Sequence, residues 1–208
     1  LLFLLRYHKA YQDTMAKTMV ENTLSKMRLG GIFDHIGFGF HRYSTDQEWF
    51  LPHFEKMLYD QAMISLAYLE AFEISKKQEY ASIAHEIFSY VARDMTDENG
   101  GFYSAEDADS EGEEGKFYVW STSEINKVLG SIEGKQFTDV YGFNENGNFH
   151  DEATGQLVPS NIPFLKNRII EYGEKNKIDV ASLKVTLEKN RNTLFEYRRN
   201  RIHPLKDD

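Results

Sequence analysis

The sequence predicts an all-α chain that forms part of an α/α toroid, with short β-hairpins in its loops. Apolar residues recur at helical spacing in several segments, in most of them on one face and in one on almost every face. A glycine pair, first Gly30–Gly31 and then Gly100–Gly101, ends an amphipathic helix each time. Each pair is followed by a polar loop with alternating aromatic residues and a tryptophan at its end. Such a repeat indicates stacked helical hairpins.

The first three helices alternate in character. Residues of about 13–28 are expected to form an amphipathic helix. Pro52 is expected in the first turn of the next helix, which runs to about Ser75 and is apolar on almost every face, so it must be surrounded by protein. The third helix, about 77–95, is amphipathic again. This alternation is typical of the inner and outer rings of a toroid.

The second half of the chain predicts shorter helices. Ser121–Glu124 is a capping-box sequence that opens a helix ending at Gly130. Another short helix is expected over about 131–141, and a long one over about 180–199 with Asp179 as its N-cap. A ring of paired helices needs more hairpins than these. The whole chain is therefore interpreted as one piece, roughly the first half of a toroid.

Composition excludes several classes of function. Residues 1–208 suit one domain or one large piece of a domain, and 41% hydrophobic with 27% charged residues indicates a soluble globular chain. No apolar run reaches the length of a membrane span, and a net charge of −9 argues against a nucleic-acid partner. The absence of cysteine excludes disulfides, thiolate catalysis and cysteine-ligated zinc in this chain, and is compatible with a cytoplasmic location.

The richest stretch, Gly31–Gln61, carries the first candidate site. Its ionisable residues flank or begin the apolar helix, where charges are costly unless they are paired or face a cavity: His41, Arg42, His53, Glu55, Lys56 and Asp60. On a helix His53 and Asp60 would share one face with Met57 and Ile64. One hypothesis makes Glu55 and His53 an acid and a base, with Arg42 and Lys56 binding anions or hydroxyls. The other makes the group a charge network that seals the loop to the helix.

The acidic segment Glu106–Gly115 carries the second candidate site. It imitates the first half of a calcium loop, but Tyr118 stands where the bidentate glutamate is required, so an EF-hand is rejected. A weaker cation site is one alternative and a solvated acidic turn is another. The first carboxylates of the segment follow an aromatic strand and are candidates to face a sugar: Glu106, Asp107 and Asp109.

Two further patterns bear on ligands. Trp49 and Trp120 suit stacking against sugar rings, although aromatic packing between loops and helix ends is equally common. The three histidines of the rich stretch are not spaced like a metal motif, so no metal is expected. Gly37–Gly39 resembles part of a dinucleotide fingerprint but lacks its third glycine and the preceding buried strand, so no cofactor is expected.

Four long motifs carry a family resemblance: Gly30–Ser44, Trp49–Ala62, Gly101–Trp120 and Arg198–Asp208. They resemble the large thioredoxin-domain-containing proteins, a family that includes bacterial YyaL-type proteins and the spermatogenesis-associated protein 20 of animals. The resemblance implies an N-terminal thioredoxin-like domain followed by a toroid similar to six-hairpin glycosidases and sugar epimerases. This chain would hold neither the thioredoxin-like domain nor the second half of the toroid. Phe38 departs from the family, which more often has glycine there.

The resemblance implies a carbohydrate-processing domain, either epimerase- or isomerase-like or glycosidase-like. The expected catalytic residues are His53, Glu55, Asp107 and Asp109. The expected substrate-binding residues are His41, Arg42, Trp49, Lys56, Asp60, Glu106 and Trp120. The competing hypothesis is a non-catalytic helical platform that binds proteins or regulates the attached thioredoxin-like domain. Apolar helix faces left open by a partial toroid predict self-association.

Overall fold

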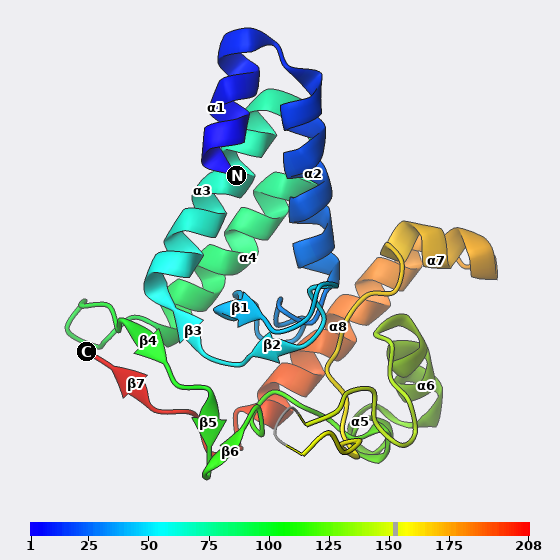
Figure 1. Ribbon diagram of the computed structural model, residues 1–208. Coiled ribbons are helices and arrows are strands. Elements are labelled where there is room, and N and C mark those ends of the chain that lie inside the picture. Colours follow the sequence, from blue (N-terminus) through cyan, green and yellow to red (C-terminus); the bar gives the residue numbers. More distant parts are fainter. Residues whose placement is uncertain (152–153) are drawn as a thin grey trace.

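The computed structural model describes residues 1–151 and 154–208, and within them it contains eight helices and seven two-residue strands (Figure 1). The helices form two groups, α1–α4 and α5–α8. Six strands lie in loops between helices, and β7 follows α8. The predicted helical class with short β-hairpins in the loops is therefore confirmed. No helix of the described part is long and apolar enough to cross a membrane.

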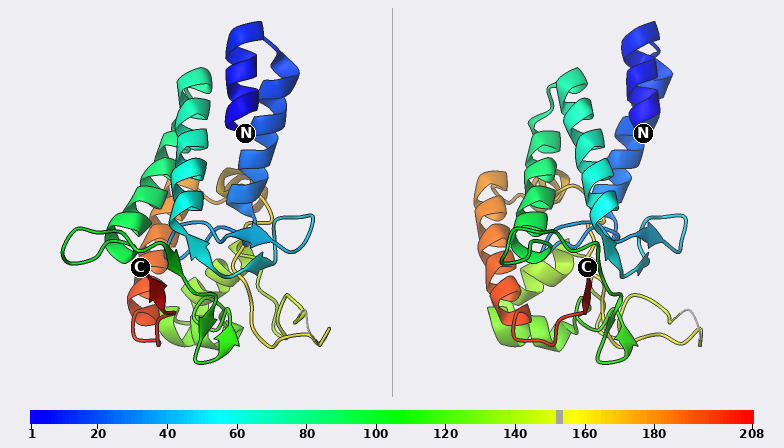
Figure 2. Two further views of the ribbon diagram at one scale, coloured as in Figure 1. Left: turned by 60° about the vertical axis from the view of Figure 1, so that its left-hand side comes forward. Right: turned by 90° about the vertical axis from the view of Figure 1, so that its left-hand side faces the viewer.

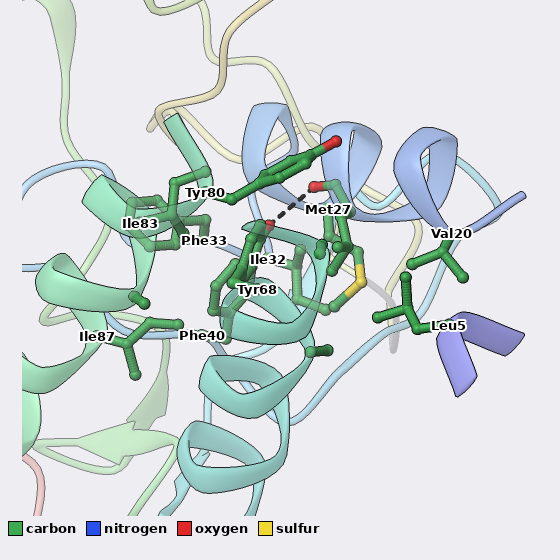
Figure 3. Packing of buried hydrophobic residues seen from close by; sticks show 14 residues of the cluster. Leu5, Val20, Met27, Ile32, Phe33, Phe40, Tyr68, Tyr80, Ile83 and Ile87 are labelled. Carbon is green, nitrogen blue, oxygen red and sulfur yellow. Dashed lines mark hydrogen bonds between the residues drawn. The ribbon is translucent and has the colours of Figure 1, made fainter. Parts of the chain in front are cut away.

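The first group consists of α1 (Leu2–Tyr11), α2 (Thr14–Leu29), α3 (Leu58–Ser75) and α4 (Gln78–Asp94). The Asp13 carboxylate accepts the Ala16 N–H and begins α2, while Gly30 ends it. The helices share a hydrophobic core with the loop after α2, and inside it the Tyr68 hydroxyl donates to the Leu24 carbonyl at 2.8 Å (Figure 3). The helices expected over 13–28 and 77–95 are confirmed.

The second group consists of α5 (Thr122–Leu129), α6 (Ser131–Val140), α7 (Ile169–Asn176) and α8 (Val180–Arg198). The side chains of Ser121 and Asp179 accept N–H groups at the starts of α5 and α8, as their positions predict. The buried members of its core come from α5, α6, α8, the loops beside them and the loop after α2: Ile36, Trp120, Ile125, Phe137, Val140, Tyr141, Leu165, Leu183, Leu187 and Leu194. α7 has no counterpart among the predicted helices, since it has only two turns and contains Gly173, a residue that disfavours helix.

The start of α3 corrects the sequence prediction. The helix begins at Leu58, and the residues before it form β2 (Pro52–His53) and β3 (Lys56–Met57). β2 pairs with β1 (Tyr43–Ser44), and β3 pairs with β4 (Ala105–Glu106). Proline suits a short strand as well as a first helical turn, and pairing with the two loops decides between them.

The extended backbone changes which side chains lie together. Phe54 and Lys56 are buried, whereas His53 and Glu55 are partly exposed, because side chains alternate between the two faces of a strand. The helical face expected to hold His53 beside Asp60 does not exist. The charged residues divide instead into an outer and an inner set.

Strands also join distant parts of the chain. β5 (Asp109–Ser110) and β6 (Glu113–Glu114) form the hairpin of the second loop, as β1 and β2 do in the first. β7 (Lys206–Asp207) pairs with β4, so β3, β4 and β7 form one small sheet near the C-terminus (Figure 2). This sheet holds the start of α3, the second loop and the end of the chain together.

One face of α3 is open, which corrects the expectation that protein surrounds this helix. Tyr59, Met63 and Leu66 are 51%, 53% and 46% exposed. They recur at i, i+4 and i+7, so they lie along one side of the helix. The other sides of α3 pack against α1, α2 and α4.

Candidate functional site

The outer set of charged residues forms a chain of contacts on the exposed face of residues 52–57. The Arg42 guanidinium donates to Glu55 Oε2 at 2.7 Å, and His53 Nε2 lies 3.7 Å from the same oxygen. His53 Nδ1 lies 2.7 Å from Glu114 Oε1, on the second loop. We call these four residues, together with Asp60, the outer cluster.

Aromatic and acidic neighbours complete the outer cluster. The Tyr43 ring stacks on the His53 ring with centroids 4.9 Å apart, because the register of β1 and β2 places the two residues opposite each other. Arg42 also interacts with the Tyr59 hydroxyl at the start of α3. Tyr43 and Tyr59 are each about half exposed. The cluster thus offers two accessible aromatic side chains beside charged groups.

Asp60 differs from the other carboxylates of the outer cluster. Burial raises the pKa of Asp60 above its ordinary value, the Arg42 charge opposes this, and the Glu55 charge adds to it. Its Oδ2 atom is buried and has no hydrogen-bond partner among the described residues. Glu55, in contrast, is held by Arg42. The two carboxyl groups therefore stand in different electrostatic environments.

The inner set is buried and centred on Asp34. The Arg198 guanidinium donates to both oxygens of Asp34 at 3.0 and 2.7 Å, and Lys56 Nζ donates to Oδ2 at 2.9 Å. Burial alone would raise the pKa of Asp34, but Arg198 and Lys56 hold it well below the ordinary value. Gly37 is required beside this pair, because a Cβ there would lie 2.0 Å from Arg198 Nη2.

Glu106 is the second carboxylate of the inner set, and it lies near Lys56. It lies opposite Lys56 in the β3–β4 register, and both side chains are buried. Glu106 accepts hydrogen bonds from the hydroxyls of Tyr118 and Tyr90, and Lys56 Nζ lies 4.3 Å from the Tyr90 ring centroid. The cavity beside these residues has a volume of about 10 Å³, which is too small for a sugar. The inner cluster, Asp34, Lys56, Glu106 and Arg198, is thus a closed ion network.

His41 lies in the interior. Its Nδ1 is 2.8 Å from the Phe54 carbonyl, and its ring packs edge-on against Tyr118 at 4.7 Å. Burial and, to a smaller extent, the Lys56 charge lower the pKa of His41 to about 3. His41 is therefore neutral at physiological pH and supports the inner cluster.

The remaining predicted site residues lie apart from one another. Asp107 and Asp109 are exposed, and Asp109 is opposite Glu114 in the β5–β6 register, next to the outer cluster. Trp120 is buried beneath the Arg201 guanidinium, 3.9 Å from the ring centroid. Trp49 is half-buried and lines an open pocket with a volume of about 700 Å³.

The predicted site residues thus divide between the outer and the inner cluster, and several of them belong to neither. The structure brings together His53, Glu55, Arg42 and Asp60 in the outer cluster, and Lys56 and Glu106 in the inner one. It does not bring either tryptophan to them. The residues that were missed are Asp34, Tyr59, Glu114 and Arg198. Asp34 and Arg198 stand inside two of the long motifs, which was the available signal. Within the described residues, no group of three His, Asp or Glu side chains is placed to hold a metal ion.

Comparison with known proteins identifies relatives over nearly the whole chain. No protein-family model matches it. Human spermatogenesis-associated protein 20 is 40% identical over 225 residues, which covers 98% of this chain. The mouse protein of the same name is 39% identical over 212 residues, or 93% of this chain. The chain belongs to the spermatogenesis-associated protein 20 family.

This result confirms the resemblance that the four motifs predict. An uncharacterised protein of Caenorhabditis elegans is also 34% identical over 206 residues, or 89% of this chain. The chain spans 29% of the length of the human relative and 27% of the mouse relative. Neither name states a reaction, so activity has to be argued from the residues.

Proposed function

We propose that this chain is part of a carbohydrate-processing α/α toroid, to which the outer cluster contributes acid and base groups. The supporting observation is the pair of carboxyl groups around Arg42. Asp60 has a raised pKa, and Glu55 is paired with a guanidinium. Two carboxyl groups in contrasting environments are the usual equipment for proton transfer at a sugar.

The roles follow from the contacts. Asp60 is the group that holds a proton and donates it, and Glu55 is the base that accepts one. His53 links Glu55 to Glu114 and carries Tyr43 on its ring, so it orients the base and the stacking surface together. Tyr43 and Tyr59 are exposed enough to pack against a sugar ring. The second half of the toroid would supply the opposite wall.

The experiment is saturation-transfer NMR against a panel of mono- and disaccharides. Glu55→Gln removes the negative charge of the base, and Asp60→Asn replaces the carboxyl group that donates the proton by an amide. Both keep the side-chain shape and are expected to abolish transfer to the bound sugar. Glu145→Gln, on an exposed residue outside the cluster, serves as the matched control and is expected to leave transfer unchanged. Absence of transfer to every sugar of the panel contradicts the proposal.

A second candidate function is the non-catalytic platform, which one observation favours. Phe3, Tyr7 and Tyr11 form an aromatic stripe along α1, and they are 74%, 39% and 71% exposed. Exposed aromatic side chains are typical of protein interfaces. This function requires a protein partner, for which the thioredoxin-like domain implied by the resemblance is the candidate. Titration of that domain into the chain, followed by NMR, tests it. Chemical shift changes confined to α1 support the platform, and their absence contradicts it.

A further inference from the structure

The open pocket at Trp49 lies outside both charged clusters. It has a volume of about 700 Å³, within the range of small-molecule sites. Its walls come from the C-terminal end of α2, the loop between β1 and β2, and the segments around Gly142 and Phe164. No residue of the outer or inner cluster lines it. The pocket therefore needs an explanation of its own.

The loop between β1 and β2 holds Trp49 in a rare backbone conformation. Trp49 has a φ of 64°, in the left-handed region that bulky residues seldom adopt. The Asp46 carboxylate accepts the N–H groups on both sides of it, from Glu48 at 2.7 Å and Phe50 at 3.1 Å. The Trp49 carbonyl accepts the Ile32 N–H at 3.1 Å. Such strain persists only where the surroundings impose it, and it concentrates at ligand sites.

The rest of the wall is also fixed in place. Phe50 and Phe164 pack edge-on with centroids 4.8 Å apart. The Asn148 amide donates to the Gly142 carbonyl at 3.1 Å and to the Ile162 carbonyl at 2.9 Å, which ties the two far segments together. A ligand would thus meet a preformed aromatic surface and would lose little affinity to ordering the protein.

Four polar side chains that line the pocket form no ion pair or hydrogen bond with any described residue. Lys26 and Lys166 line the pocket and are exposed, and neither forms an ion pair with any described residue. The side-chain amides of Gln47 and Asn144 also line it, again without a hydrogen-bond partner in the described part of the chain. Two free ammonium groups attract an anion, and free amides suit hydroxyl groups. Glu48 is the one acidic residue of the lining, so the pocket has a local net positive charge in a chain of net charge −9.

We propose that this pocket binds a phosphorylated sugar. The sugar ring packs on Trp49, the phosphate lies at Lys26 and Lys166, and the hydroxyls contact Gln47 and Asn144. The ligand class follows from this combination of one aromatic face, two cations and two amides. The proposal does not depend on the chemistry proposed at Glu55, because no residue is shared between the two sites.

Calorimetric titration of the chain with glucose 6-phosphate tests the proposal. The double variant Lys26→Met with Lys166→Met is expected to bind at least about tenfold more weakly at low salt, since two charge-assisted contacts are lost. The matched control is Lys127→Met with Lys184→Met, two exposed lysines outside the pocket, which is expected to bind like the original chain. Equal weakening in both double variants, or no binding by the original chain, overturns the proposal.

Two further measurements separate the ligand classes. Glucose and inorganic phosphate are each expected to bind more weakly than glucose 6-phosphate, because each makes only part of the contacts. Tighter binding of adenosine monophosphate than of the sugar phosphate overturns the assignment to a sugar. Trp49→Gly removes the ring and suits the left-handed backbone, so it is expected to lose binding without loss of the cooperative thermal transition. Unchanged binding by this variant also overturns the proposal.

Discussion

Arg198, the last residue of α8, grips both carboxylate oxygens of Asp34 at 3.0 and 2.7 Å, although 164 positions separate the two residues. Both side chains are almost fully buried. Asp34 belongs to the loop that follows α2, so this pair fastens the end of the second helical group to the first. Lys56 completes the network from the start of α3. The inner cluster therefore connects the two helical groups.

Removal of one charge from the inner cluster is predicted to lower the free energy of unfolding strongly. Arg198→Met leaves the Asp34 carboxylate buried with one cation instead of two, and breaking a buried pair costs on the order of 3–5 kcal/mol. Urea denaturation followed by circular dichroism measures the loss. Arg199→Met, which breaks the exposed pair with Glu196, is the control and is expected to cost less than about 1 kcal/mol. Similar losses in the two variants would contradict the prediction.

Two buried histidines predict the response to acid. Burial lowers the pKa of His35 and His41 from 6.5 to about 3, with Arg28 adding to this for His35 and Lys56 for His41. Between those values the unfolded chain binds more protons than the folded chain. Stability is thus complete above about pH 6.5 and falls as the pH is lowered, by about 1.4 kcal/mol per pH unit for each histidine.

Urea denaturation at intervals between pH 5 and 6.5 measures this slope, above the range where Asp34 begins to contribute. His41→Asn retains a side-chain donor for the Phe54 carbonyl and removes one titrating group. Burial also lowers the pKa of His203, so this residue contributes to the slope with the same sign. The variant is expected to remove the share of His41 and to leave those of His35 and His203, whatever its effect on stability at pH 7. A slope that the variant leaves unchanged would show that His41 is charged in the folded chain.

Helical periodicity predicts most of the helices that the structure contains, whereas their arrangement in a toroid stays a prediction. The helices over 13–28, 77–95 and 180–199 agree with the structure because their apolar stripes act locally, and Asp13 and Asp179 also cap the first and the last of them. The start of α3 did not, since residues 52–57 gain strand pairing from β1 and from β4, which lies far along the sequence. No local pattern contains that pairing. For residues 52–57, pairing with distant strands therefore outweighed the local preference for a helix.

The function of the predicted site residues stays a prediction, and the structure shows only how these residues are arranged. The side chains of Gly31–Gln61 were expected to act together, and the alternation of an extended backbone separates Lys56 from Glu55. Arg198 and Glu114 reach their partners from distant segments, so their roles depend on the folded geometry. The motifs contain most of the charged residues of the two clusters, and the strand register determines which of these charges pair.

The backbone conformation of Phe38 predicts that glycine at this position is more stable than alanine, the reverse of the usual order. Its φ is 70°, in the left-handed region, where glycine is the residue without a steric penalty. The ring is partly buried and lies beneath the Arg191 guanidinium at 4.2 Å, so any small replacement loses packing. Phe38→Gly is nevertheless expected to be more stable than Phe38→Ala by about 1 kcal/mol, because only alanine keeps the left-handed penalty. Differential scanning calorimetry compares the two, and a more stable alanine variant would refute the backbone argument.

The exposed side of α3 predicts self-association of the chain. Tyr59, Met63 and Leu66 present an apolar strip that water meets directly, and contiguous exposed apolar area favours contact between molecules. Light scattering is expected to give a mass above that of the monomer, rising with concentration. Met63→Lys with Leu66→Lys is expected to lower it to the monomer mass. Ile132→Lys with Val185→Lys, which also removes two exposed apolar residues, is expected to change nothing, because those residues lie on α6 and α8. A monomer mass for the original chain at every concentration would contradict the prediction.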